Sequence, residues 1–226
     1  MLDKSESIPV AVVGPTCSGK TQIVNELAMR LPLSVINLDS FQIYDHFRLG
    51  TGRADLAEGI RSYLYGVQDP RQTILPEEYV AAALDAQTEI QRSGRIPLYE
   101  GGSVSFLRAL LPRQPLRLFG LYPDTADEAR LRIERRVLGG DESALIDEIQ
   151  SALALGFRET LVLRDDVVYL PYLDYVEGRV SLEAARERAI ANLTKRHVAQ
   201  LTDYRDFEIT WLRAGEAMLR LTDELR

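Results

Sequence analysis

The chain has 226 residues, 46% of them hydrophobic, which is enough for one α/β core with a small appendage. Its formal net charge of −7 and pI near 5.0 argue against a protein that grips a long nucleic acid, because such binding depends largely on basic residues that neutralise phosphates. A single cysteine, no apolar run near the roughly 20 residues of a membrane span, and a polar stretch at residues 1–7 in place of a signal peptide favour a cytoplasmic protein that binds no membrane.

Strands and helices alternate along the first half of the chain. Residues 8–13 are expected to form a short β-branched strand, and residues 20–31 a helix that ends before Pro32. The same patterns predict strands at residues 34–38, 96–99 and 116–122, and helices at residues 76–93 and 104–111. Strands that alternate with helices over short connections predict a parallel sheet with helices on both faces.

The second half of the chain is mainly helical. Amphipathic patterns predict helices at residues 124–137, 143–155, 181–205 and 215–226, with one short strand at residues 210–212. The sequence therefore predicts two parts: an α/β core at residues 1–122, and a mainly helical part at residues 123–226. The second part is expected to pack on the core and to complete a substrate channel.

The most specific motif is Gly14-Pro15-Thr16-Cys17-Ser18-Gly19-Lys20-Thr21, which fits the phosphate-binding loop G-x-x-x-x-G-K-[ST] and stands between a strand and a helix. Backbone N–H groups of such a loop point at a phosphate chain, and Lys20 adds a charge. The Thr21 hydroxyl can ligate a Mg²⁺ that rides on the phosphates. The motif predicts a P-loop NTPase-like fold but leaves the phosphate compound open. Cys17 is interpreted as a small loop residue rather than a nucleophile.

Two more polar segments follow predicted strands, namely Asp39-Ser40 and Gly101-Gly102-Ser103. Ligands of open α/β sheets bind at the carboxyl ends of the strands, so these segments and the loop are expected to share one site. Asp39 can hold a metal ion or accept a proton from a nucleophile, and capping of a turn is the alternative.

Other polar residues are ambiguous from sequence alone. The Thr16 hydroxyl can bind a leaving oxygen, although the motif treats this position as an ordinary loop residue. Arg132, Arg135 and Arg136 can make bidentate phosphate contacts, but a solvated helix face is favoured for Arg132 and Arg135. His197 lies on the apolar side of its predicted helix and is interpreted as a core residue.

The order of these motifs resembles the P-loop isopentenyltransferases. One branch of that family prenylates an adenosine of tRNA, and the other prenylates free adenine nucleotides to make cytokinins. The resemblance covers nearly the whole chain, through residues 14–21, 38–44, 49–53, 99–103, 132–137, 156–159, 175–178, 181–185, 200–202 and 211–212.

The resemblance implies that adenine N6 attacks C1 of dimethylallyl diphosphate and that diphosphate leaves. Asp39 then matches the family's base, and Thr16 matches the hydroxyl that contacts the bridging oxygen. Lys20, Arg136 and Mg²⁺ would stabilise the charge on the leaving group. The implied acceptor-binding residues are Asp39, Ser40, Thr51 and Ser103.

The two branches differ in a helical insertion that tRNA-modifying members carry between the glycine-rich strand end and the arginine-bearing helix. Only residues 103–132 separate these features here, and one helix and one strand use most of them. With the acidic balance, this favours a free nucleotide, AMP first, and no long nucleic acid. A tRNA adenosine is the alternative acceptor.

The prenyl donor is predicted from two positions. His197 aligns with a histidine that bacterial cytokinin synthases use toward a hydroxylated prenyl donor, and Leu155 stands where those enzymes have a partner aspartate. The two residues are expected to line the prenyl-donor pocket. Loss of one polar partner favours the plain dimethylallyl chain, because a buried hydroxyl would find fewer partners.

Two other classes of protein remain open. A small-molecule or nucleotide kinase would share the fold, the loop and Asp39, but residues 50–53 and 100–103 and the Gly-Pro-Thr opening of the loop argue against it. A nucleotide-binding regulator without catalysis is disfavoured by the intact Lys20, Thr21 and Asp39.

Overall fold

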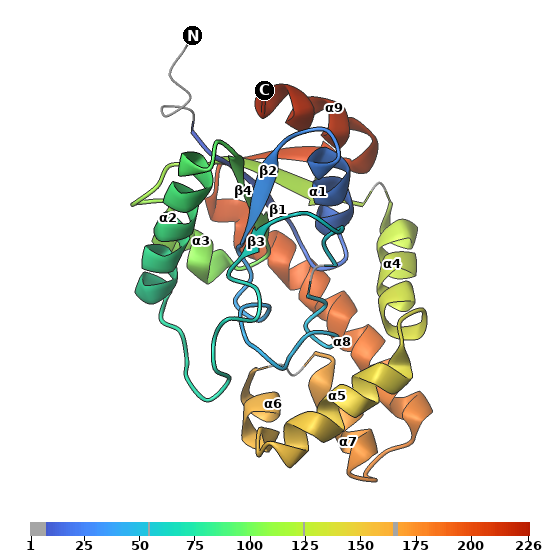
Figure 1. The fold of residues 1–226 in the computed structure, drawn as a ribbon. Helices are drawn as coiled ribbons and strands as arrows, with labels where there is room; N and C mark the ends of the chain where they lie inside the picture. The colour runs from blue at the N-terminus through green and yellow to red at the C-terminus, as the bar shows by residue number, and fades with distance from the viewer. Residues whose placement is uncertain (1–7, 54, 124, 165–166) are drawn as a thin grey trace.

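The computed structural model describes residues 8–53, 55–123, 125–164 and 167–226 (Figure 1). Within these residues, parallel strands form one six-stranded sheet in the order β3-β2-β4-β1-β5-β6. The strands are β1 (Val10–Val13), β2 (Leu33–Asn37), β3 (Ser62–Tyr63), β4 (Ile96–Gly101), β5 (Arg117–Tyr122) and β6 (Ile209–Arg213). The predicted parallel α/β sheet is confirmed.

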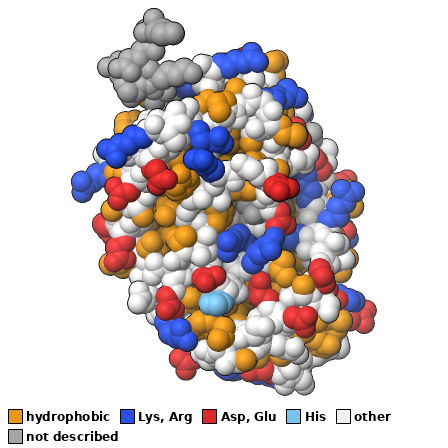
Figure 2. Space-filling model, in the orientation of Figure 1, with side chains coloured by type: hydrophobic (Ala, Val, Ile, Leu, Met, Phe, Trp, Pro, Cys, Tyr) orange, Lys and Arg blue, Asp and Glu red, His pale blue; other side chains and the backbone are white. Residues whose placement is uncertain are grey.

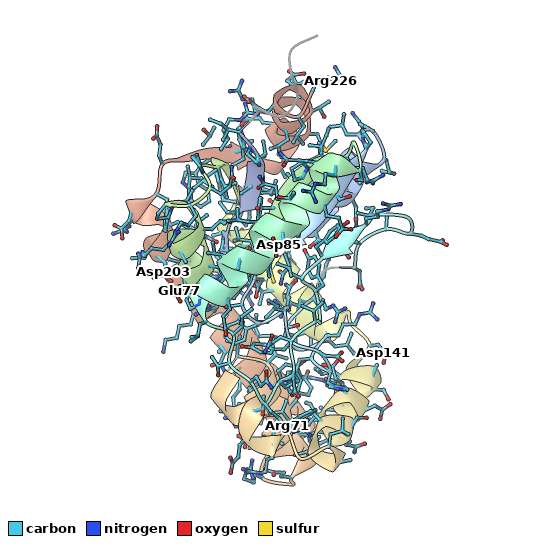
Figure 3. The ribbon with its side chains drawn as sticks, turned by 60° about the vertical axis from the view of Figure 1, so that its left-hand side comes forward. Arg71, Glu77, Asp85, Asp141, Asp203 and Arg226 are labelled. Carbon is cyan, nitrogen blue, oxygen red and sulfur yellow. The ribbon has the colours of Figure 1, made fainter. Side chains whose placement is uncertain are left out.

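Helices cover both faces of the sheet. On one face, α1 (Lys20–Ala28) and α9 (Ala214–Glu224) form a buried apolar cluster with Val10 and Val12 of β1. On the other, α2 (Pro76–Arg92), α3 (Val104–Leu110) and α8 (Leu182–Asp203) form a cluster with Ala11 and Val13. Because successive side chains of a strand point to opposite faces, β1 is buried along its whole length. Glu77 and Asp85 lie on the exposed side of α2, which crosses its face of the sheet (Figure 3).

A helical lobe follows β5 and α4 (Ala126–Leu138). It consists of α5 (Glu142–Ala154), α6 (Arg158–Arg164) and α7 (Tyr169–Val176), and it lies below the sheet in Figure 1. α8 begins beside the lobe and runs back to the sheet, so it joins the two (Figure 1). The side chains of Thr125, Asp141 and Ser181 cap α4, α5 and α8 by accepting a backbone N–H three residues on.

The sequence analysis did not predict β3, α6 or α7. These elements have two, seven and eight residues, which is too short for a clear hydrophobic period. Arg71, in the long connection after β3, lies against the lobe (Figure 3), where its guanidinium stacks 4.5 Å from the centre of the Phe157 ring. The connection is therefore held by contacts with residues far away in sequence.

The end of the chain returns to the sheet. β6 pairs with β5, and α9 packs against α1. The predicted division at residue 122 therefore differs from the structure, because β6 and α9 belong to the sheet core and only α4 to α8 form the mainly helical part. No helix within the described ranges is both long and apolar enough to span a lipid bilayer.

Candidate active site

Three strand ends meet at one edge of the sheet. β4 lies between β1 and β2, so the phosphate-binding loop, Asp39-Ser40 and Gly102-Ser103 are neighbours. Gly101 allows the close approach of β4 to the end of β2, because a Cβ at this position would lie 2.7 Å from the backbone nitrogen of Asp39. The strand order thus produces the shared site that the three motifs predict.

Two adjoining cavities lie at this edge. The larger, here called the loop cavity, has a volume of about 670 Å³, and the smaller, called the side cavity, about 80 Å³. In Figure 2, Lys and Arg side chains gather near the middle of the face, where it is hollowed. The wall that both cavities share consists of Thr16, Asp39, Thr51, Gly102, Arg136 and Gln200. Beyond that wall, the loop cavity is also lined by Ser18, Lys20, Thr21, Glu100, Arg132 and Arg135. The side cavity is also lined by Ser40, Phe41, Ser103, Val167, Leu193 and Arg196.

The phosphate-binding loop has the backbone that its glycines permit. Gly14 has φ 145° and Gly19 has φ 97°, both in the half of φ space that glycine enters freely. A Cβ on Gly19 would also lie 2.5 Å from the Arg132 guanidinium. Cys17 has φ 61° without being glycine, a conformation that costs of order 1–3 kcal/mol and is typical of functional loops.

Lys20 points back into its own loop. Its ammonium donates hydrogen bonds of 3.0 Å to the carbonyl oxygens of Gly14 and Pro15. Burial lowers the pKa of Lys20, although the nearby Glu100 and Asp39 carboxylates oppose the shift. The ammonium is therefore held at the loop and inside the cavity that an anion would enter.

Glu100 is a site residue that the sequence analysis quoted but did not assign. It is 2% exposed, accepts a hydrogen bond of 2.7 Å from the Tyr65 hydroxyl, and accepts another of 3.3 Å from the Thr21 hydroxyl. Burial raises the pKa of the Glu100 carboxyl, while Lys20 and the Tyr65 hydrogen bond act in the opposite direction. A carboxylate directly before Gly101-Gly102 at the end of a buried strand was the signal available in the sequence.

Arg136 reaches the loop from α4. It donates hydrogen bonds of 2.7 Å to the Thr16 hydroxyl and 2.8 Å to the Gly50 carbonyl oxygen. Since arginine can only donate, Thr16 Oγ1 accepts in this contact. The pair joins the phosphate-binding loop to the segment after β2, and both residues stand on the wall between the cavities.

Arg132 does not lie on a solvated face, so that expectation is wrong. Its guanidinium donates 2.7 Å to the Ser18 carbonyl oxygen and pairs with Glu128 at 2.5 Å. The reason is the position of α4, which packs beside the loop and turns Arg132 toward Gly19. Arg135 is exposed, as expected, but it also lines the loop cavity.

Asp39 has the features of both alternatives weighed from the sequence. Its Oδ1 accepts backbone N–H groups of Phe41 at 2.9 Å and Gln42 at 3.4 Å, which is the capping role. Its Oδ2 faces Gly102, 3.7 Å from where a Cβ of that glycine would be. One oxygen thus fixes the turn, and the other faces the shared wall.

The residues expected around an acceptor lie close together. Ser40 and Ser103 line the side cavity, and Thr51 lines both cavities. The Thr51 hydroxyl donates to the carbonyl oxygens of Phe47 at 3.2 Å and Arg48 at 3.0 Å, so its lone pairs are left to accept. Ser103 also caps α3 through the N–H of Phe106, at 3.4 Å.

α8 and the residue that directly follows it, Tyr204, place three polar side chains beneath the loop. His197 Nδ1 donates to the Thr16 carbonyl oxygen at 2.7 Å, and Gln200 Oε1 accepts the Thr16 N–H at 2.7 Å. The Tyr204 hydroxyl lies 3.3 Å from both the nitrogen and the carbonyl oxygen of Gly14. The sequence analysis quoted residues 200–202 without assigning a role to Gln200, and it did not single out Tyr204; the position of α8 reveals both contacts.

The expected prenyl-donor pair is not brought together at these cavities. His197 is 6% exposed beneath the loop, where burial lowers the pKa of its ring. Leu155 is 47% exposed at the end of α5, and neither residue lines the loop cavity or the side cavity. The buried position of His197 fits the core role weighed from the sequence, and its place in a prenyl-donor pocket stays a prediction.

The comparisons of this chain with known proteins agree on one family of similar proteins. The isopentenyl transferase family model matches residues 9–118. The tRNA dimethylallyltransferase of Staphylococcus aureus MRSA252 is 30% identical over 155 residues, 68% of this chain and 48% of the relative, so the match spans about half of that protein. The tRNA dimethylallyltransferase of Solibacter usitatus is 26% identical over 285 aligned positions, 90% of this chain and 92% of the relative.

Solved structures give the same fold. The full-length tRNA isopentenylpyrophosphate transferase of Bacillus halodurans superposes with a TM-score of 0.84 at 23% identity, over 96% of this chain and 95% of that one. At this identity the likeness supports the fold, including the helical part after β5.

Proposed function

We propose that the protein is an isopentenyl transferase, the family whose model matches residues 9–118, and that it transfers a dimethylallyl group from dimethylallyl diphosphate to the N6 amine of an adenine, releasing diphosphate. The observation that carries the proposal is the wall shared by the two cavities, which contains Asp39, Thr16 and Arg136. Asp39 can act as a base, and Thr16 and Arg136 can donate hydrogen bonds to a leaving group. This arrangement suits direct transfer of the prenyl group from a diphosphate in the loop cavity to an acceptor in the side cavity. The family match also argues against the kinase alternative.

On the acceptor side, Asp39 Oδ2 is the proposed base. Adenine N6 is a poor nucleophile, and a carboxylate that takes its proton as the N6–C1 bond forms would raise its reactivity. The Thr51 oxygen, whose hydrogen is directed at backbone carbonyls, can accept the second N6 hydrogen and orient the amine.

On the donor side, the C1–O bond breaks and the electron pair goes to diphosphate. Thr16 accepts from Arg136 and so keeps its own hydrogen for the bridging oxygen. Lys20, Arg136 and the loop N–H groups would hold the remaining charge, which increases in the transition state.

A Mg²⁺ fits the donor set at the loop. Thr21 and Glu100 supply two oxygen atoms at the loop cavity, and oxygen is the ligand this cation prefers. No group of three or more His, Cys, Asp or Glu side chains suited to a metal occurs in the described part of the chain. Phosphate oxygens of the donor would therefore complete the coordination, and the ion would neutralise the leaving diphosphate.

The acceptor is the finer question, and two observations favour different answers. The relatives named above are tRNA dimethylallyltransferases, which favours an adenosine of tRNA and weighs against the expectation of no long nucleic acid. The 285 aligned positions exceed the 226 residues here, so the relative has residues that this chain lacks. Between α3 and α4, the residues that the structure describes form only β5 and short links. This second observation favours a free nucleotide such as AMP, as in cytokinin biosynthesis.

Mass spectrometry of products tests both candidates. The protein would be incubated with dimethylallyl diphosphate, Mg²⁺ and, separately, a tRNA pool, AMP, ADP or ATP. The proposal expects one dimethylallyl group added to adenine in at least one reaction. Phosphoryl transfer from ATP without any prenylated product would contradict it and restore the kinase alternative.

A further inference from the structure

Arg196 is a cationic residue of the side cavity with no ion-pair partner in the described part of the chain. It lies on α8, where its neighbours one turn away are Asn192, Leu193, Ala199 and Gln200. None of these is a carboxylate, so its own helix does not neutralise the guanidinium.

The arginines on the other side of the site are engaged differently. Arg132 donates to the loop backbone and pairs with Glu128, and Arg136 holds Thr16 and the Gly50 carbonyl oxygen. Both line the loop cavity, where a diphosphate would bind. Arg196 lines the side cavity but not the loop cavity, so its guanidinium belongs to the acceptor side of the site.

The other residues of the side cavity are of the kinds that contact a nucleoside. Phe41, Val167 and Leu193 supply apolar surface for a flat base, and Ser40 and Ser103 supply hydroxyl groups. A guanidinium beside such a surface adds a partner for a phosphate group, which a nucleotide has and a nucleoside lacks. Arginine is suited to phosphate because its planar fork can bind two phosphate oxygens at once.

We propose that Arg196 binds a phosphate group of the adenine acceptor and thereby selects nucleotides over nucleosides. The inference rests on the proposed function, which supplies the adenine acceptor. The phosphate is a 5′-phosphate in AMP and a backbone phosphodiester in RNA, and the guanidinium recognises both by the same contacts.

Calorimetry without a prenyl donor tests this assignment. AMP and adenosine would be titrated into the wild type, Arg196→Gln and Lys195→Gln, with saturating diphosphate and Mg²⁺ to fill the loop cavity. Lys195 is the matched control, because it is the adjacent exposed cation and lines neither cavity. A short stem-loop RNA with an adenosine in its loop, and the same RNA without that adenosine, form the second arm.

The wild type and Lys195→Gln are expected to bind AMP, or the adenosine-bearing RNA, at least about tenfold more tightly than adenosine. Arg196→Gln should lose this preference while its affinity for adenosine is unchanged. If Arg196→Gln loses affinity for AMP, the ligand of Arg196 is the 5′-phosphate of a free nucleotide. If it loses affinity for the RNA alone, the ligand is a backbone phosphodiester. A preference that survives in Arg196→Gln, or a wild type without any preference, overturns the assignment.

The result is separable from the transfer reaction. Absence of prenylated product in every incubation, with the AMP preference and its loss in Arg196→Gln intact, would refute the proposed function and leave the phosphate contact standing. Prenylation of AMP and adenosine with equal efficiency by the wild type would support the proposed function and refute the phosphate contact of Arg196.

Discussion

The guanidinium of Arg136 donates a hydrogen bond of 2.7 Å to the hydroxyl of Thr16, across 120 residues of sequence. This contact fixes the direction of the Thr16 hydroxyl, because the oxygen accepts from Arg136 and its hydrogen remains for another acceptor. A position that the generic loop motif leaves free to vary is thus tied to α4.

The Arg136–Thr16 contact should therefore be visible as coupling in turnover. Thr16→Val and Arg136→Gln are each expected to lower kcat by roughly 10²–10³, the usual loss for a donor to a developing charge. Because the two groups act together, the double variant should lose less than the sum, with a coupling of about 0.5–3 kcal/mol. The coupling energy is measured from the kcat values of the wild type, the two single variants and the double variant, with the acceptor that mass spectrometry identifies. If the two losses in kcat simply add as free energies, the contact is incidental.

Asp39→Asn separates the two oxygens of this carboxylate. The amide oxygen can still accept the Phe41 N–H, so the turn should persist, but the side chain can no longer take a proton. Turnover should fall by about 10²–10⁴ with diphosphate affinity, measured by calorimetry, unchanged. An equal loss of diphosphate affinity in the presence of Mg²⁺ would instead make Asp39 a metal ligand.

Glu100 should make stability depend on pH. Burial raises the pKa of its carboxyl in the native state above the ordinary 4.5. At a pH between the ordinary pKa and the raised native pKa, the native state therefore binds more protons than the unfolded state. Stability from this group is complete below pH 4.5 and is lost as pH rises through the folded pKa. Glu100→Gln should therefore flatten the fall in the free energy of unfolding with rising pH, as measured by urea denaturation from acid to neutral pH.

The control for that experiment is Glu216→Gln, which removes the same charge from the exposed side of α9. It should keep the wild-type slope. If Glu100→Gln has the wild-type slope as well, the carboxyl of Glu100 does not have a raised pKa in the native protein.

Gly101 and Gly102 should differ in their tolerance of a methyl group. A Cβ on Gly101 would overlap the Leu38 carbonyl group, which is backbone and cannot move without shifting β2 and Asp39. A Cβ on Gly102 would lie 3.1 Å from the Gln200 amide nitrogen, the end of a side chain. Gly101→Ala should cost about 2 kcal/mol or more in unfolding free energy and Gly102→Ala clearly less, and equal losses would contradict this account.

Much of the α/β core could be predicted because local patterns specify it. The run of β-branched residues before Gly14, the helix after Gly19 and the short apolar run at residues 96–99 each predict one element without reference to the rest of the chain. The lobe was harder to predict: α7 has eight residues, and its Tyr169 and Tyr172 are buried by contacts with elements distant in sequence.

The sequence by itself determined the loop and the three polar strand ends, because a parallel sheet puts the carboxyl ends of its strands at one edge whatever the details of packing. Only the tertiary structure decided which distant side chains reach that edge. α4 turns Arg132 and Arg136 onto the loop, and α8 places His197 and Gln200 beneath it and Arg196 in the side cavity. Those positions follow from how the two helices pack against the core, a relation between residues more than a hundred positions apart that no local pattern encodes.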